Sequence, residues 1–200
     1  MDVDTVITAY ARGAFPMDSR DAPGIELYLA DPRAVLPLDG FRVPRTVARR
    51  LRSAGMECRI DTAFGRVVRG CAGSRAGGEW LTPRLVRLYD QMHAEGLAHS
   101  VEAWCGDELA GGLFGVAVGS LYTSESMFHT LPDGGNAALV FAWRHLRERG
   151  FTLWDIQMAT DHTRRFGAVE LPAGDYAGLL DAAVRRPASF DGRNPGVVVR

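Results

Sequence analysis

The feature that most constrains the fold is a run of three strand-like segments between residues 99 and 124. The segments span 99–104, 108–118 and 120–124, and only tight turns rich in Gly and Asp separate them. Strands joined by such short connections pair antiparallel with their neighbours. The run therefore predicts an antiparallel meander, in which the Gly111-Gly112 pair permits a bulge or a close approach of two backbones.

Segments with helical spacing surround this meander. Helices are predicted at 44–55, from Asp61 as N-cap to about 70, at 82–96, at 136–149, at 161–166 and at 175–185, and further strands at 56–60 and 151–157. In the first forty residues, Gly and Pro recur too often for long helices, so we expect turns and short extended pieces there. The order predicts an α+β fold with a mostly antiparallel sheet.

The positive charge of the chain is concentrated in one quarter. All 23 basic residues are arginines, and residues 40–89 hold eleven of them against three acidic residues, a net charge of +8. The rest of the chain, with twelve arginines and twenty-one acidic residues, carries −9. Such an asymmetry indicates a surface that binds a polyanion; the alternative is a set of solvated helix faces.

Several classes of protein are disfavoured. The sequence has no run of about eighteen apolar residues that would span a membrane, and its acidic start lacks the features of a secretory signal. Cys58, Cys71 and Cys105 are widely spaced and odd in number, which favours reduced thiols in the cytoplasm over a zinc or disulfide framework. His99, His129 and His162 lack the spacing of metal ligands, so no metal site is predicted.

Two segments carry polar residues suited to chemistry. On the strand at 151–157, alternate side chains share a face, so Asp155 and Gln157 are expected about 6.5–7 Å apart on one side. A carboxylate and an amide on an apolar strand are costly unless they are paired or used; the alternative is that both satisfy loop backbone. Glu125 follows another strand in a hydroxyl-rich stretch that suits a ribose or an amine.

Nine short motifs, in order over roughly residues 8–180, resemble those of the bacterial leucyl/phenylalanyl-tRNA–protein transferases. They lie at 9–16 (AYARGAFP), 31–36 (DPRAVL), 63–71 (AFGRVVRGC), 79–82 (EWLT), 99–102 (HSVE), 111–117 (GGLFGVA), 125–128 (ESMF), 155–157 (DIQ) and 161–163 (DHT). The resemblance implies a small N-terminal domain at 1–40 and a domain with a GNAT-like acetyltransferase fold at 41–200. It also implies transfer of Leu or Phe from aminoacyl-tRNA to the N-terminal amine of a protein that starts with Arg or Lys. Because the aminoacyl ester is already activated, no cofactor is expected.

The resemblance also assigns roles to residues. Asp155 would be the electrostatic partner or base near the attacking amine, with Gln157 as its orienting neighbour, and Glu125 would hold the acceptor. Trp80 would stack on the terminal adenosine. An amino-acid pocket is expected from Leu113, Met127, Leu139 and Tyr122, and phosphate contacts from Arg42, Arg45, Arg49, Arg50, Arg52 and Arg84. The enzyme would act in the cytoplasm as a monomer.

The chain departs from the pattern of this family at several positions. Met17 and Tyr28 stand where tryptophans are expected, Asn136 replaces a lysine, Thr160 replaces an asparagine, and Ala142 replaces a bulky aromatic residue. These departures leave open a second acceptor, a small-molecule amine in natural-product assembly. A third possibility is a tRNA-binding module without activity or an acetyl-CoA-dependent enzyme, but the glycine-rich turn that binds acetyl-CoA is not evident.

Overall fold

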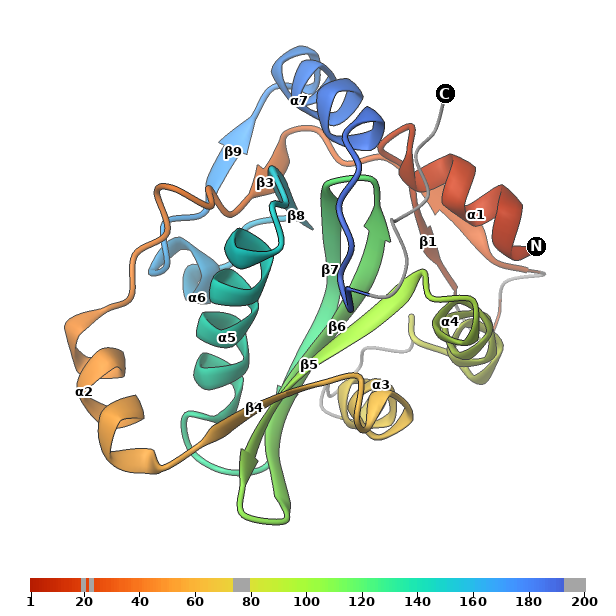
Figure 1. Cartoon of the computed structure of the whole chain (residues 1–200). Helices are drawn as coiled ribbons and strands as arrows, with labels where there is room; N and C mark the ends of the chain where they lie inside the picture. Colours follow the sequence, from red (N-terminus) through yellow and green to blue (C-terminus); the bar gives the residue numbers. More distant parts are fainter. Residues whose placement is uncertain (19–20, 22–23, 74–79, 193–200) are drawn as a thin grey trace.

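A seven-stranded sheet forms the centre of the molecule (Figure 1). The computed structural model describes residues 1–18, 21, 24–73 and 80–192. In spatial order the strands are β4 (Glu57–Ile60), β5 (Ala98–Cys105), β6 (Glu108–Val118), β7 (Leu121–His129), β8 (Leu153–Gln157), β3 (Arg33–Val35) and β9 (Val169–Leu171). A separate hairpin-like pair joins β1 (Phe15–Met17) to β2 (Glu26–Tyr28).

The predicted meander is confirmed, because β4 to β7 pair antiparallel in chain order. Strand β8 pairs parallel with β7 after a crossover through α5 (Gly134–Glu148). The register of β6 and β7 shifts between Phe114 and Gly115: Gly115 lies opposite Ser124, whereas Phe114 lies opposite Ser126. Glu125 is therefore an extra residue in β7, and this β-bulge locally bends the strand.

Two hydrophobic cores cover the two faces of the sheet. One core packs α1 (Val3–Tyr10), α3 (Phe64–Gly73), α4 (Pro83–Ala94) and α7 (Ala173–Arg185) against one face. The other packs α5, Val47 of α2 (Arg45–Ala54) and Phe166, which follows α6 (Asp161–Arg164), against the opposite face. Successive residues of a strand alternate between these cores, as Leu121 and Tyr122 do. The α+β class predicted from the sequence is confirmed.

The expectation of only turns and short extended pieces in the first forty residues is wrong for residues 3–10. Residues Val3–Tyr10 form α1, and the Asp2 side chain caps it by accepting a hydrogen bond from the Thr5 backbone N–H at 2.8 Å. The helix buries an apolar face that includes Val6 and Tyr10. The glycine and proline residues that suggested turns begin only after the helix has ended, at Gly13.

Asp61 is likewise not the helix N-cap that was expected. It has a φ of 57°, and its carboxylate accepts a hydrogen bond from the Ser100 backbone N–H at 2.7 Å. A side chain of β5 instead caps the start of α3: the Glu102 carboxylate accepts a hydrogen bond from the Ala63 backbone N–H at 2.8 Å. The strand meander thus supplies the cap of the helix that packs on it.

The glycine pair in β6 allows the close backbone approach that was predicted. A Cβ atom on Gly111 would lie 2.5 Å from the carbonyl carbon of Gly134, at the start of α5.

The first forty residues contribute one strand to the main sheet, since β3 lies between β8 and β9. Within the described part of the chain, no helix has the length and apolarity to cross a membrane.

Candidate active site

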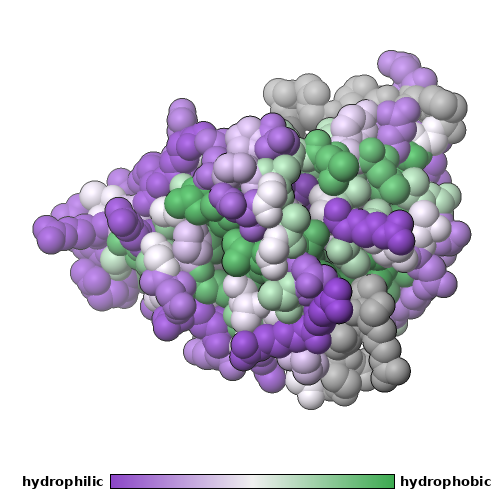
Figure 2. Space-filling model, turned by 90° about the horizontal axis from the view of Figure 1, so that it is seen from above, coloured by the Kyte–Doolittle hydropathy of each residue, from purple (hydrophilic) through white to green (hydrophobic). Residues whose placement is uncertain are grey.

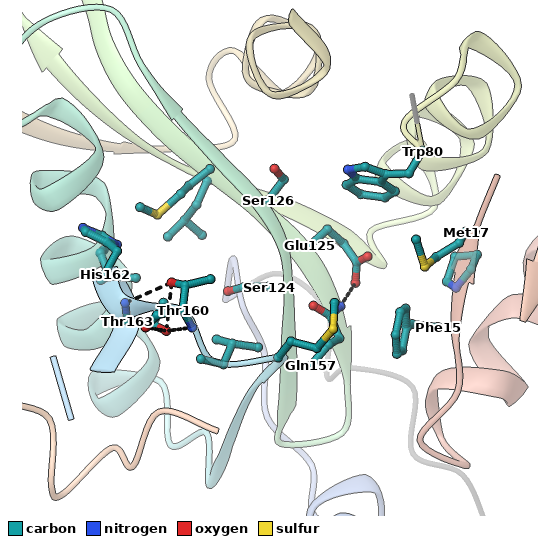
Figure 3. Close-up of a pocket in the computed structure, with 16 residues that line it drawn as sticks. Phe15, Met17, Trp80, Ser124, Glu125, Ser126, Gln157, Thr160, His162 and Thr163 are labelled. Atoms are coloured by element: carbon teal, nitrogen blue, oxygen red, sulfur yellow. Dashed lines mark hydrogen bonds between the residues drawn. The ribbon is translucent and has the colours of Figure 1, made fainter. Parts of the chain in front are cut away.

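A cavity of about 390 Å³ opens where β7 continues beyond the end of β8 (Figure 3). Trp80, Met17 and Phe15 lie to one side of Glu125 in this view, and Thr160, Thr163 and His162 lie on the other side. The apolar wall comes from three elements, with Leu113 of β6, Met127 of β7 and Leu139 of α5. The cavity therefore joins an apolar pocket to a small polar centre.

Glu125 is the acid of this polar centre. Its carboxylate accepts hydrogen bonds from the Tyr89 hydroxyl at 2.8 Å and from the Gln157 side-chain amide at 3.1 Å. The Tyr10 hydroxyl lies 3.2 Å behind that of Tyr89. Burial raises the pKa of Glu125 from its ordinary 4.5 to about 7; the nearby charge of Asp155 adds to this rise, and the tyrosine hydrogen bonds oppose it. A group with such a pKa can take up or release a proton near neutral pH.

This raised pKa predicts a pH-dependent stability. Between pH 4.5 and about 7 the folded protein holds a proton on Glu125 that the unfolded chain has lost. The stabilisation is fully present below pH 4.5 and is lost as the pH rises through about 7, an effect of roughly 3 kcal/mol. Urea unfolding of the wild type and of Glu125→Gln, from pH 4.5 to 8, measures it. The difference between the two proteins should shift with pH; a constant difference would contradict the assignment.

Asp155 lies behind the cavity and does not line it. Its fully buried carboxylate accepts hydrogen bonds from Arg33, through Nε at 2.9 Å and Nη2 at 2.6 Å, and from the Tyr176 hydroxyl at 2.7 Å. It also accepts the backbone N–H of Gln157 at 2.8 Å. Gln157 has a φ of 55°, which is uncommon for a residue other than glycine. Asp155 therefore holds the backbone conformation from which Gln157 reaches Glu125.

Arg33 is fixed as firmly as the carboxylate it binds. It is 1% exposed, donates from Nη1 to the Gly13 carbonyl at 2.7 Å, and lies over the rings of Phe15 and Tyr176 at 4.9 and 5.0 Å. Arg33, Tyr89 and Tyr176 were not among the residues expected from the sequence. A charged side chain within the apolar strand β3 was a usable signal for Arg33, whereas Tyr89 belonged to a helical stripe assigned to the core.

Six of the residues predicted for catalysis, adenosine stacking and the amino-acid pocket line the cavity, namely Trp80, Leu113, Glu125, Met127, Leu139 and Gln157, whereas Asp155 and Tyr122 do not. Tyr122 does not line the cavity: its hydroxyl donates to the His99 carbonyl at 3.2 Å, and its ring stacks on Phe190 at 4.9 Å. It is buried in the second core because it lies at the start of β7, before the residues that line the cavity, and packs against Phe190 of the segment after α7. Ala142 is buried in the same core and does not line the cavity either.

The positions where the sequence departs from the family pattern differ in their relation to the cavity. Met17 and Thr160 line it. Tyr28 is exposed on β2 and donates to Glu26 at 2.8 Å. The Asn136 side-chain oxygen Oδ1 accepts a hydrogen bond from Nε2 of the lining residue His162 at 2.9 Å, so Asn136 lies one layer behind the wall.

The predicted phosphate-binding arginines fall into two groups. Four lie on α2 and one lies just before it, and all are exposed: Arg42, Arg45, Arg49, Arg50 and Arg52. The end of the molecule where α2 lies is mostly hydrophilic (Figure 2). Arg84 is on α4, at the opposite face of the sheet, and donates to the Asp18 carboxylate at 2.7 and 2.9 Å. Arg75 of the basic quarter and Glu79 of the EWLT motif lie outside the described residues.

Comparison with known proteins places this chain among the transferases. Residues 35–181 match the family model described as leucyl/phenylalanyl-tRNA protein transferase. A leucyl/phenylalanyl-tRNA–protein transferase of Caulobacter vibrioides is 45% identical over 199 residues, which cover 97% of this chain and 91% of that protein. One from Nitratidesulfovibrio vulgaris is 44% identical over 188 residues, 92% of this chain and 80% of that protein. The chain belongs to the leucyl/phenylalanyl-tRNA–protein transferase family.

A solved structure shares the fold at much lower sequence identity. The structure of L-PGS from Bacillus licheniformis covers 86% of this chain and 73% of its own, with a TM-score of 0.50 and 12% identity. At this identity the similarity concerns the arrangement of helices and strands alone.

Proposed function

We propose that this protein transfers Leu or Phe from aminoacyl-tRNA to the N-terminal amine of a protein that begins with Arg or Lys, in the cytoplasm. The observation that carries the proposal is the cavity in which the Glu125–Gln157 pair meets an apolar pocket, in a chain of this family. The sequence had also left open a small-molecule acceptor. That acceptor is not favoured, since the curated relatives are named as protein transferases.

Each part of the cavity suits one part of the substrates. Leu113, Met127 and Leu139 would hold the Leu or Phe side chain by apolar contact, which distinguishes neighbouring sizes only modestly. Trp80 and Met17 would flank the terminal adenosine, with the indole face stacked on the base. Glu125 and Gln157 would face the acceptor amine.

Glu125 would accept a proton from the incoming ammonium group, since only the neutral amine attacks an ester carbonyl. The Gln157 side chain would orient that amine, and Asp155 would act as a positioning residue through the backbone of Gln157. Holding the amine against the activated ester removes much of the entropic cost of the reaction. The aminoacyl ester supplies the driving force.

The activity is tested directly with the purified chain. Leu-tRNA and Phe-tRNA carrying a labelled amino acid are incubated with a peptide that starts with Arg and with the same peptide acetylated at its N-terminus. Label is expected on the free peptide alone. If neither aminoacyl-tRNA labels it, the proposed function is wrong.

Removing charge from α2 should weaken tRNA binding without changing the chemical step. We propose that the exposed arginines of α2 contact phosphates, so a triple change of Arg49, Arg50 and Arg52 to Gln removes up to three contacts. The slope of log K against log salt concentration should then fall by roughly 1 per lost contact. Filter binding at several salt concentrations measures it. Arg186→Gln, an exposed change next to α7, is the control; an unchanged slope in the triple variant would argue against this surface.

A further inference from the structure

His162 lines the cavity, and its hydrogen bonds determine which of its ring nitrogens carries a hydrogen atom. The side-chain amide of Asn136, at the start of α5, donates to the Asp133 carboxylate at 2.8 Å. An ionised carboxylate only accepts, so the amide turns its NH₂ group toward Asp133 and its oxygen toward His162. The amide oxygen also only accepts, so Nε2 of His162, at 2.9 Å from it, must be the donor.

The second ring nitrogen, Nδ1, is therefore a bare acceptor in the neutral ring. Burial lowers the pKa of His162 from its ordinary 6.5, and the nearby Arg165 and His129 lower it further, so the ring is neutral at neutral pH. Nδ1 has no hydrogen-bond partner in the part of the chain that the structure describes. Its lone pair diverges from the Nε2–H bond and so is directed away from Asn136, which lies behind the wall.

The His162 ring stands beside the apolar wall of the amino-acid pocket. Asn136, which holds the ring, and Leu139 are three residues apart on α5 and so share a face of the helix. Leu139 forms the apolar wall together with Leu113 and Met127, which lie directly opposite each other on β6 and β7. The pocket therefore has one polar acceptor among its apolar side chains.

This acceptor lies on the side of the cavity away from the expected adenosine. Figure 3 shows Glu125 between Trp80 on one side and His162 on the other. With the adenosine at Trp80 and the reacting ester at Glu125, the side chain of the transferred residue extends toward His162. The nitrogen therefore meets the far end of that side chain.

We propose that His162 Nδ1 accepts a hydrogen bond from the phenol of tyrosine, so that this protein transfers Tyr from Tyr-tRNA in addition to Leu and Phe. Tyrosine has the ring of phenylalanine with an O–H donor at its far end. The inference rests on the proposed function and widens its donor substrate. The covalent step is the same: the amine nitrogen bonds to the tyrosyl carbonyl carbon and loses one proton, while the ester bond breaks and the ribose oxygen gains one.

Asn136 makes this acceptor possible. It replaces the lysine of the family pattern, and a lysine ammonium only donates, so it could not hold Nε2 in its protonated form. The exchange thus changes the hydrogen-bonding character of the pocket without changing a residue that lines it.

The partner on the protein decides whether a phenol is accepted. A wholly apolar pocket disfavours an added hydroxyl by about 100-fold, because that group loses water without a replacement. A pocket with a matching acceptor removes most of this penalty. The wild type is therefore expected to use Tyr-tRNA with a kcat/KM within tenfold of that for Phe-tRNA.

The test follows transfer from tRNA charged with Tyr, Phe or para-fluorophenylalanine to a peptide that starts with Arg. Para-fluorophenylalanine is close to tyrosine in size and has no O–H, so the ratio of the two rates isolates the hydrogen bond. His162→Leu should lower this ratio roughly tenfold, whatever its effect on overall activity, whereas His162→Gln, which keeps an acceptor oxygen, should retain more of it. Asp161→Asn, an exposed change next to His162 that does not line the cavity, is the control and should leave the ratio unchanged.

Two outcomes overturn the proposal: a wild-type kcat/KM for Tyr-tRNA more than tenfold below that for Phe-tRNA, or a ratio in His162→Leu within twofold of wild type. If His162→Leu does not fold, the wild type decides alone. Its affinity for an amide-linked tyrosyl adenosine should exceed that for the para-fluorophenylalanyl analogue about fivefold, and equal affinities would contradict the hydrogen bond. Transfer of Phe without Tyr removes this inference only, whereas absence of all transfer removes the proposed function.

Discussion

Replacing Arg33 by Met is expected to lower the free energy of unfolding by about 3–5 kcal/mol and to abolish measurable transfer. The change leaves the fully buried Asp155 carboxylate without its cation. A loss of this size is a large part of the stability of a typical domain. Activity should fall even where the variant is still folded, because Asp155 positions Gln157 and small displacements of an oriented group are costly.

Chemical denaturation and peptide labelling measure the two effects. Tyr176→Phe is the matched control, because it removes one neutral donor from the same carboxylate but leaves the cation in place, and it should cost less, about 1.5–3 kcal/mol. Pairing Arg33→Met with Asp155→Leu removes both charges and should recover part of the stability, though not the activity. A loss below 1 kcal/mol for Arg33→Met would show that the pair does not hold this region together.

Replacing Glu125 by Gln is expected to lower kcat/KM roughly 10²- to 10⁴-fold, because an amide cannot take a proton from the acceptor amine. The fold should persist, since Gln can still accept a hydrogen bond and has no charge to bury. In the wild type the rate should increase as the pH rises through about 7, where Glu125 ionises. The rate of the variant should not show this increase with pH.

Rates of peptide labelling by the wild type and by Glu125→Gln from pH 6 to 9 test whether Glu125 takes the proton. Glu108→Gln, an exposed change at the start of β6, keeps the same loss of charge away from the cavity and should leave both rate and profile unchanged. If Glu125→Gln retained the wild-type pH limb, the titrating group would be another residue. A rate within threefold of wild type would remove Glu125 from the proton transfer altogether.

The parts of the fold that depend on neighbouring residues were predictable from the sequence. Turn residues and alternation define the meander, and the caps of α4 are visible in Thr82 and Pro83. The missed helix α1 was obscured by the Gly and Pro residues that follow it. The bulge at Glu125 was not predictable, because a register shift depends on how β7 packs against β6 and has no local signature.

The candidate site, like the fold, was predictable from the sequence only in part. The motifs pointed to Glu125 and Gln157, which meet in the cavity, and to its apolar wall. They did not show that Asp155 faces away from the cavity, because its partner Arg33 is 122 positions distant in the chain. Alternation along β8 predicted one face for Asp155 and Gln157, whereas the left-handed backbone at Gln157 separates what their side chains contact.

The position of β3 in the sheet determines which parts of the fold can form first while the chain is being synthesised. This strand leaves the ribosome early, yet both strands that flank it, β8 and β9, come from the last quarter of the chain. At about 5–20 residues per second, Arg33 waits roughly 6–24 s before Asp155 is made. The meander can form meanwhile, so the nascent chain acquires its sheet before its active centre. A protein cut short before β8 would thus lack Asp155, Gln157 and both strands that flank β3.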